Sequence, residues 1–268
     1  MSKSFIAKIE EKILMMSKSD FMDSQEKIND LLKERLKADE KSPKSIFKSI
    51  DFNGTQVFTF GDKNARRVIV FIHGGAFINE INYQHHLFCL ALSKKLDAYV
   101  IAPVYPLAPK HTCDETFDLM ENLYGSIISK LAKDQTLSLM GDSAGGGFVL
   151  SFCQHLKAID LPQPNNIVVY SPWVDISLSD SPYENDSDPI LGEIGLREMG
   201  KSWAGSSWAG VGVSPGTRAG KDLSRKRDSH TEEKASGRGY GWQCIARKIA
   251  TEEELGTYGG RREPEKEE

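Results

Sequence analysis

Residues 136–146 read Thr-Leu-Ser-Leu-Met-Gly-Asp-Ser-Ala-Gly-Gly, an apolar run that ends in a serine flanked by glycines. The run Thr136–Met140 predicts a buried strand, and a helical pattern follows over Ala144–Lys157. A Gly-x-Ser-x-Gly sequence between a strand and a helix is typical of a tight turn in which small neighbours relieve backbone crowding. The hydroxyl of Ser143 would then stand at the positive end of the following helix. The stretch therefore predicts a nucleophilic serine, with an incidental serine in a glycine-rich turn as the alternative.

The chain around this turn alternates short apolar runs with longer helical patterns, from about residue 46 to residue 204. A hairpin over Ile46–Phe52 and Gln56–Phe60 is predicted to turn at Asn53-Gly54, a sequence that favours type I′ geometry. Strand–helix–strand repetition with apolar strands predicts an α/β fold with a mostly parallel sheet and right-handed crossovers. The further predicted strands are Val68–Ile72, Ala98–Val104 and Asn166–Tyr170, and the further predicted helices are roughly Tyr83–Leu96 and Thr112–Leu131.

A second motif, His73-Gly74-Gly75-Ala76, follows the predicted strand Val68–Ile72. Consecutive glycines allow backbone N–H groups to converge on an oxyanion, and each such donor contributes about 3 kcal/mol to acyl transfer. The alternative is a common glycine turn in which His73 only hydrogen-bonds the loop. Both motifs end parallel strands, and ligand sites in open α/β sheets gather at that edge. Together they favour one site that contains both turns.

Four stretches in this order resemble the hormone-sensitive-lipase-type branch of the α/β-hydrolase superfamily, the bacterial esterase and lipase group. The resemblance covers roughly residues 45–205 and implies a carboxylesterase that needs no metal or organic cofactor. It also implies that Ser143 is the nucleophile and that the amides of Gly74, Gly75 and Ala144 form the oxyanion hole. Lys110 departs from the glutamate usual in the family. The matching stretches are residues 73–77 (HGGAF), 105–111 (YPLAPKH), 141–146 (GDSAGG) and 171–175 (SPWVD).

Residues 1–45 are charged, with apolar residues at helical spacing. Ile6, Ile9, Ile13 and Leu14 form one stripe, and a less regular stripe runs from Met22 to Leu36. Two amphipathic helices are predicted, and family members carry such helices as a cap over the site. The expected organisation is therefore an N-terminal cap over residues 1–45 and an α/β-hydrolase core over residues 46–204. Packing helices without a lid role are the alternative.

The composition changes abruptly near Gly205, and Gly, Arg, Lys and Glu dominate residues 210–268. Such a segment buries too little apolar area to fold, so residues 205–268 are expected to be an atypical, disordered tail. The last strands of the fold are then missing, and Asn166–Tyr170 becomes an unprotected apolar edge. A shifted reading frame past residue 205 is one hypothesis for the change.

A catalytic histidine is the element that the sequence does not supply. His155 lies three turns into the helix after Ser143, and His230 lies in a charged stretch with no strand before it. Gly216-Thr217-Arg218 weakly resembles the family's segment before the catalytic acid, and Asp222 follows it. Without a base, a serine hydrolase retains only about 10³–10⁴-fold catalysis over water.

Composition excludes other classes of function. Lys plus Arg is 34 and Asp plus Glu is 38, so the net charge of −4 leaves no basic footprint for nucleic acid. No apolar run reaches the roughly 18 residues of a membrane span. Cys89, Cys113, Cys153 and Cys244 lack metal or disulfide spacing, which favours reduced thiols and a cytoplasmic protein.

Three functional hypotheses follow from the sequence. The first is a serine carboxylesterase or lipase-like hydrolase of short- to medium-chain acyl esters that acts through an acyl-enzyme. Its C-terminus is then damaged, and it is inactive if no catalytic acid and histidine are present. The second is a non-catalytic small-molecule-binding protein on the same scaffold. The third is the product of a disrupted gene. The substrate class is a small ester in the first case, and the oligomeric state is left open.

Overall fold

The computed structural model describes residues 20–39, 43, 45–178, 188 and 190–205, and the structural statements below concern these residues. The expected helix over Ile6–Leu14 and residues 206–268 of the expected tail lie outside them. None of the described helices is long and apolar enough to span a membrane. The elements are η1 (Asp20–Asp23), α2 (Gln25–Lys37), β1 (Ser49–Phe52), β2 (Thr55–Phe60), β3 (Arg67–Ile72), α3 (Tyr83–Leu96), β4 (Ala98–Pro103), α4 (Cys113–Ile128), β5 (Thr136–Asp142), α5 (Ser143–Ala158), β6 (Asn166–Tyr170) and α6 (Glu193–Ala204).

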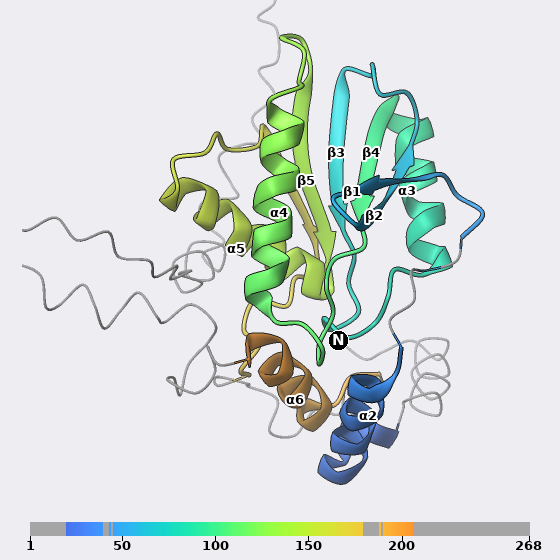
Figure 1. Cartoon of the computed structure of the whole chain (residues 1–268), viewed down its shortest axis with the longest axis vertical. Coiled ribbons are helices and arrows are strands. Elements are labelled where there is room, and N and C mark those ends of the chain that lie inside the picture. Colours follow the sequence, from blue (N-terminus) through green and yellow to red (C-terminus); the bar gives the residue numbers. More distant parts are fainter. Residues whose placement is uncertain (1–19, 40–42, 44, 179–187, 189, 206–268) are drawn as a thin grey trace, which may run out of the picture.

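The strands form one mixed sheet in the order β1-β2-β4-β3-β5-β6. The neighbours β4, β3, β5 and β6 run parallel, whereas β1 and β2 are antiparallel to each other and β2 is antiparallel to β4. Figure 1 shows α3 on one face of this sheet and α4 with α5 on the other. The expected mostly parallel α/β sheet is therefore confirmed.

The predicted hairpin is confirmed at its turn. Phe52 pairs with Thr55, and the two residues between them are Asn53 and Gly54. Both have positive φ, 51° and 86°, as a type I′ turn requires. This hairpin adds the two antiparallel strands at one edge of the sheet.

Two apolar layers hold the helices to the sheet, and β3 contributes to both. Val68, Val70 and Ile72 belong to the layer that also contains residues of α4 and α5. Ile69 and Phe71 belong to the layer beneath α3. Because side chains alternate along a strand, an unbroken apolar run serves both faces. The central strand β3 is therefore apolar from Val68 to Ile72 because both of its faces are buried.

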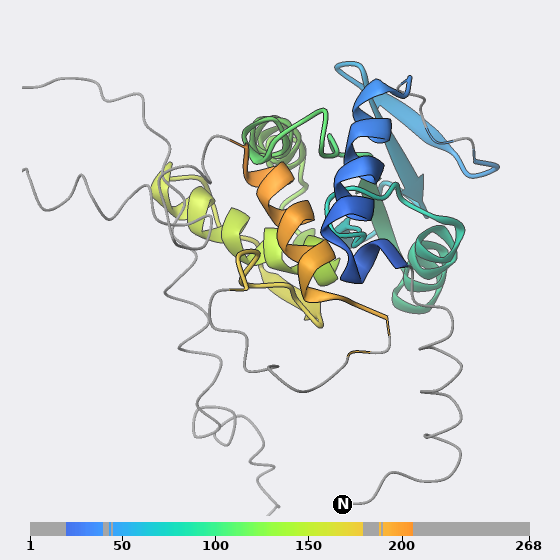
Figure 2. The same cartoon turned by 90° about the horizontal axis from the view of Figure 1, so that it is seen from below.

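The helices α2 and α6 lie side by side beyond the end of the sheet at which β5 ends (Figures 1 and 2). Met22 of η1 is packed between them, and a Cβ on Gly195 of α6 would lie 2.8 Å from the Cα of Met22. Leu36 of the predicted apolar stripe is 57% exposed, so the stripe is shorter than expected. The helix α6 contacts α2 and η1, and its residues Met199, Trp203 and Ala204 also belong to the apolar cluster that contains residues of α4 and α5. The assignment of α6 to the core range 46–204 stays a prediction. The helix itself was not predicted, although Leu196, Met199 and Trp203 follow helical spacing.

The strand β6 is the edge of the sheet within the described residues. Ile167, Val168 and Tyr170 are each at least 40% exposed. The expectation that this edge is uncovered in the whole chain stays a prediction, because residues 206–268 lie outside the described residues. Uncovered apolar edges favour aggregation.

Candidate functional site: a nucleophile elbow and a glycine loop

Ser143 lies at the junction of β5 and α5, which follow one another without an intervening residue. Its φ is +49°, in the left-handed region that costs an L-residue about 1–3 kcal/mol unless the surroundings enforce it. A Cβ on Gly141 would lie 2.6 Å from the carbonyl oxygen of Gly145. Only glycine at position 141 allows β5 to reverse so sharply into α5. The expected tight strand-to-helix turn is therefore present; it is called the elbow (residues 141–147) below.

The elbow packs directly on the end of β3. A Cβ on Gly145 would lie 2.1 Å from the carbonyl oxygen of Ile72 and 2.6 Å from that of His73. Ile72 also pairs with Gly141 in the sheet register. The glycines of the second motif are thus brought next to Ser143, as the two motifs together predict.

The main-chain groups of Ser143 and Ala144 have distinct roles. The Trp173 amide donates to the Ser143 carbonyl oxygen at 2.9 Å, which ties the elbow to the segment after β6. The Ala144 amide belongs to the first turn of α5, where backbone N–H groups have no intrahelical acceptor and the helix dipole is positive. The Ser143 hydroxyl makes no hydrogen bond with any described residue.

Asp142 connects the elbow to the second motif. Its Oδ1 accepts a hydrogen bond from the Gly74 amide at 2.9 Å, and its Oδ2 lies 3.7 Å from His85 Nε2. Burial raises the pKa of Asp142, but His85 and the Gly74 amide lower it by more, so this pKa lies below its usual range. The sequence analysis expected the Gly74 amide in an oxyanion hole, whereas the structure uses it to bind a carboxylate.

His73 is a buried structural residue. Its Nδ1 lies 2.7 Å from the Gly74 carbonyl oxygen, and Tyr105 stacks on its ring and donates to its carbonyl oxygen at 2.8 Å. Burial lowers the pKa of His73 to about 4, so the ring is neutral at physiological pH. A neutral, stacked imidazole supports the loop that follows it.

The segment after His73 is called the glycine loop (residues 74–79). Gly75, Ala76 and Phe77 have φ values of +117°, +52° and +62°, three consecutive residues in the left-handed region. The amides of Ile78 and Asn79 both donate to the Gly75 carbonyl oxygen, at 3.1 and 2.9 Å. The amides of Gly75 and Ala76 donate to no acceptor in the described part of the chain. This loop therefore offers two backbone donors beside the elbow.

Aromatic side chains fix the middle of the glycine loop. Phe77 stacks on Trp203 of α6 with ring centroids 3.8 Å apart and an interplanar angle of 5°. Trp173 lies on Phe77 as well, at 5.9 Å, and the Ala108 amide donates to the Phe77 carbonyl oxygen at 2.9 Å. The indole N–H of Trp203 is buried without an acceptor among the described residues. Trp173 and Trp203 thus pack against the glycine loop from the segment after β6 and from α6.

His155 was expected to be unsuitable as the catalytic base, and its position confirms this. His155 is 2% exposed, and its Nε2 lies 3.0 Å from Glu121 Oε2 on α4. It therefore joins α5 to α4 and does not face the elbow. Asp222 and His230 lie outside the described residues.

A cavity of about 360 Å³ borders the glycine loop. Its lining comes from α2, the turn before β2, the glycine loop and the segment after β4, and it includes Arg35, Ile78, Glu80 and Tyr105. Ser143, Gly74, Gly75 and Ala144 are absent from that lining, so this cavity is separate from the elbow. Within the described residues, no group of three or more acidic, histidine or cysteine side chains is arranged to bind a metal.

Sequence comparison finds esterases and lipases among the proteins that this chain is similar to. The chain is 29% identical to an esterase of Acinetobacter venetianus over 116 residues, which are 43% of this chain and 38% of that protein. It is 33% identical to a triacylglycerol lipase of Mycobacterium tuberculosis over 110 residues, 40% of this chain and 25% of that protein. The chain therefore spans well under half of the length of these relatives.

Solved structures share the fold at low sequence identity. An esterase/lipase from an uncultured bacterium superposes with a TM-score of 0.58 at 22% identity, covering 76% of this chain and 69% of that one. An esterase from the bacterial hormone-sensitive lipase family superposes with a TM-score of 0.55 at 19% identity, covering 76% and 70%. The family model described as the alpha/beta hydrolase fold matches residues 69–226, more than half of the chain. The chain with this elbow and glycine loop therefore belongs to the α/β-hydrolase fold family.

Proposed function

We propose that the protein is a serine carboxylesterase that cleaves short- to medium-chain acyl esters through an acyl-enzyme at Ser143. The observation that carries the proposal is the left-handed Ser143 at the start of α5, beside a glycine loop with two unused amides. Its relatives named esterase and triacylglycerol lipase support the same reaction class. Small esters are the substrates that this proposal assigns.

In the proposed reaction the Ser143 hydroxyl oxygen attacks the ester carbonyl carbon, and the hydroxyl proton ends on the oxygen that leaves as the alcohol. The negative charge that develops on the carbonyl oxygen is stabilised by amides that are already oriented, which is the largest contribution in acyl transfer. We assign this role to the amides of Gly75, Ala76 and Ala144. Gly74, expected in the same role, instead positions the loop through its bond to Asp142. Departure of the alcohol leaves the acyl group on Ser143, and water then releases the acid.

The proton acceptor for Ser143 is not among the described residues, since its hydroxyl contacts none of their basic groups. The sequence holds one further histidine after His155, which is His230. Efficient turnover requires a base in contact with the hydroxyl, because a serine is a weak nucleophile without one. The rate of ester hydrolysis therefore shows whether a base contacts the Ser143 hydroxyl. A site without a base should exceed the reaction in water by only about 10³–10⁴-fold.

The test compares wild type with Ser143→Ala on p-nitrophenyl butyrate. A matched control is Ser151→Ala, which removes a buried hydroxyl from the same helix α5. The wild type and the Ser151→Ala variant should hydrolyse the ester, whereas Ser143→Ala should fall to background. A fluorophosphonate probe should add its mass to Ser143 alone. Equal rates for wild type and Ser143→Ala in folded samples would contradict the proposal.

A series of p-nitrophenyl esters from acetate to palmitate tests the proposed substrate range. The proposal expects the highest kcat/KM with acyl chains of short or medium length. A maximum of kcat/KM with the longest acyl chain would support ester hydrolysis but contradict the proposed substrate class.

A second candidate function is a non-catalytic receptor for small molecules on the same scaffold. The unpartnered Ser143 hydroxyl in the described part of the chain favours this alternative. It expects no hydrolysis and no probe labelling, together with a cooperative thermal melt. A chain from a disrupted gene would show no cooperative melt, so one melting experiment separates these two alternatives.

A cytoplasmic location is part of the proposal. Cys89, Cys113 and Cys153 are free thiols buried in the described structure, which suits a reducing compartment. When the protein is unfolded and alkylated during isolation without a reductant, mass spectrometry should find all three cysteines alkylated, and disulfides there would contradict this location.

A further inference from the structure

The glycine loop has a conformation that its own sequence does not favour. Ala76 and Phe77 carry Cβ atoms and still have φ values of +52° and +62°. Residues in this region persist only where surrounding contacts enforce the conformation. The loop therefore depends on groups outside itself, and these groups determine where the Gly75 and Ala76 amides point.

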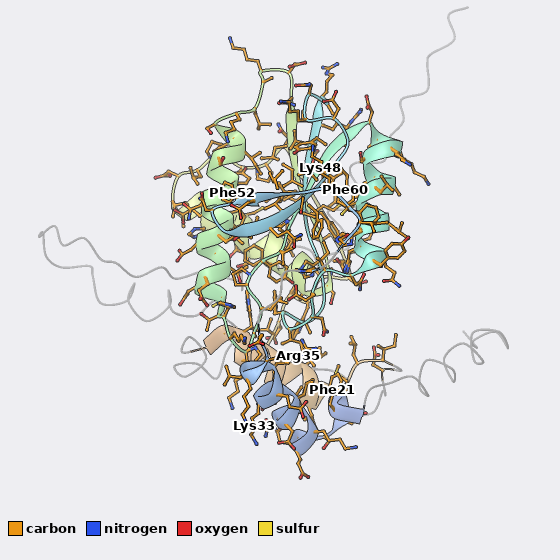
Figure 3. All side chains as sticks on the ribbon, turned by 45° about the vertical axis from the view of Figure 1, so that its right-hand side comes forward. Phe21, Lys33, Arg35, Lys48, Phe52 and Phe60 are labelled. Carbon is orange, nitrogen blue, oxygen red and sulfur yellow. The ribbon has the colours of Figure 1, made fainter. Side chains whose placement is uncertain are left out.

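One such group reaches the loop from the cap helix α2. The Arg35 guanidinium donates to the Ile78 carbonyl oxygen, and it donates to Asn79 Oδ1 at 2.8 Å. Figure 3 shows Arg35 at the end of α2 that meets the body of the molecule, with Lys33 directed away from it. A single side chain of α2 therefore binds two consecutive residues of the glycine loop.

The two residues bound by Arg35 are also those that close the loop. The amides of Ile78 and Asn79 both donate to the Gly75 carbonyl oxygen. A displacement of Ile78 and Asn79 would therefore rotate the peptide between Gly75 and Ala76, which carries one of the two available amides. The planar guanidinium suits this task because its donors are held in a rigid fork, whereas a lysine presents one compact ammonium.

We propose that Arg35 is a positioning residue that clamps the glycine loop in its left-handed conformation and thereby orients the Gly75 and Ala76 amides toward the elbow. The clamp makes the docking of α2 a condition for an assembled oxyanion site. Its structural part stands on the contacts of Arg35, and its kinetic part rests on the proposed esterase function.

Hydrogen exchange of the folded full chain tests the structural part. The variants are Arg35→Ala and the control Lys33→Ala, which removes an exposed cation two residues away on the same helix. The amides of Ile78 and Asn79, which donate to the Gly75 carbonyl oxygen, should exchange at least tenfold faster in Arg35→Ala and at the wild-type rate in Lys33→Ala. Unchanged exchange in Arg35→Ala would overturn the clamp. Equal acceleration in α3 and α5 would also overturn it, because the effect would then be global.

Kinetics on p-nitrophenyl butyrate test the functional part. Loss of one oxyanion donor lowers kcat by roughly 10²–10³-fold, so a misaligned donor in Arg35→Ala should lower kcat at least tenfold. KM should stay within about twofold, because the amides act on the transition state and contribute little to ground-state binding. Arg35→Lys should remain impaired, and millimolar guanidinium should restore part of the rate to Arg35→Ala but not to Arg35→Lys. A fall confined to KM would overturn the positioning role.

The two experiments fail in different ways. An inactive wild type refutes the proposed function while hydrogen exchange still decides the clamp. Asn79→Ala removes one of the two acceptors and should give a smaller loss of protection than Arg35→Ala. The double variant should lose little beyond Arg35→Ala, and full additivity would overturn the shared contact.

Discussion

The two turns that form the candidate site are stabilised in opposite ways. The elbow is held by backbone approaches: Gly145 contacts the carbonyl groups at the end of β3, and a Cβ on Gly147 would lie 2.0 Å from the Trp173 carbonyl oxygen. The glycine loop is held by side chains from elsewhere, including Arg35 of α2 and Trp203 of α6. The position of Ser143 is thus fixed by the sheet itself, and the glycine loop beside it is fixed by side chains of α2 and α6.

Because of this difference, the elbow and the glycine loop should tolerate substitutions differently. The elbow admits almost no added atom, because its neighbours are main-chain groups that cannot move independently. The glycine loop depends on a few long side chains, each of which can be removed without moving the sheet. Loss of the contacts from α2 and α6 should therefore move the Gly75 and Ala76 amides while Ser143 stays in place.

The largest effect is expected from removal of the aromatic stack. Trp203→Ala should lower the free energy of unfolding by about 3–5 kcal/mol, because a fully buried indole leaves a cavity. The amides of Ile78 and Asn79 should also lose exchange protection, whereas the elbow should keep it. Trp203→Phe retains a ring on Phe77 and should lose less, as urea unfolding of both variants would show. Equal loss of protection in the elbow would remove the distinction between the two turns.

An added methyl group should test the elbow. Gly145→Ala would place a Cβ 2.1 Å from the Ile72 carbonyl oxygen, so we expect destabilisation of about 3 kcal/mol, the upper end for overpacking. Gly125→Ala on α4 is the matched control, since no atom lies within 4 Å of its Cβ position. That control should stabilise the helix by about 0.5–1 kcal/mol. Urea titration measures both, and a neutral Gly145→Ala would show that the elbow can relax.

Low pH should weaken the base of the glycine loop. The pKa of His73 is lowered to about 4 in the folded state, mainly by burial, and an unfolded histidine titrates near pH 6.5. Between these values the unfolded chain binds the additional proton, so the stability falls as pH decreases from about 6.5 to 4. The loss from His73 should reach about 3 kcal/mol at pH 4.

Neighbouring groups modify this profile in known directions. The pKa of His86 is also lowered, first by burial and then by His85, so His86 adds to the loss below pH 6.5. The pKa of Asp142 is lowered as well, so its contribution is present above about pH 4 and is lost only at lower pH. Urea titrations of wild type and His73→Gln from pH 7 to 4 measure the slope. An equal slope in the variant would assign the acid loss to other groups.

The smallest effect is expected from relief of backbone strain. Ala76→Gly should raise the free energy of unfolding by about 0.5 kcal/mol, because a left-handed alanine costs about 1–2 kcal/mol. The chain entropy of glycine removes part of that gain, roughly 0.5–1 kcal/mol. Ala91→Gly, at an exposed position within α3, is the control and should lose about 0.5–1 kcal/mol. A loss in both variants would mean that Ala76 is not strained.

Local patterns predicted most of the α/β body. The helix Tyr83–Leu96 has the bounds read from the sequence, and the hairpin turns at Asn53-Gly54 as expected. The helix α6 was missed although Leu196, Met199 and Trp203 have helical spacing, because Gly195 and Gly200 within it lower the intrinsic helix propensity. Nothing local marks Arg35, which is one charge in a charged helix. Its partners lie 43 and 44 residues further along the chain.

The sequence by itself determined the elbow, because glycine spacing, an apolar strand and a following helix specify that turn within a dozen residues. It also determined the order of the strands along the chain and the position of both motifs at strand ends. Only the tertiary structure decided which amides beside Ser143 are available, since Asp142 binds that of Gly74 and leaves those of Gly75 and Ala76. It alone joined α2 and α6 to the glycine loop, because contacts between distant residues follow from packing and leave no periodic trace in the chain.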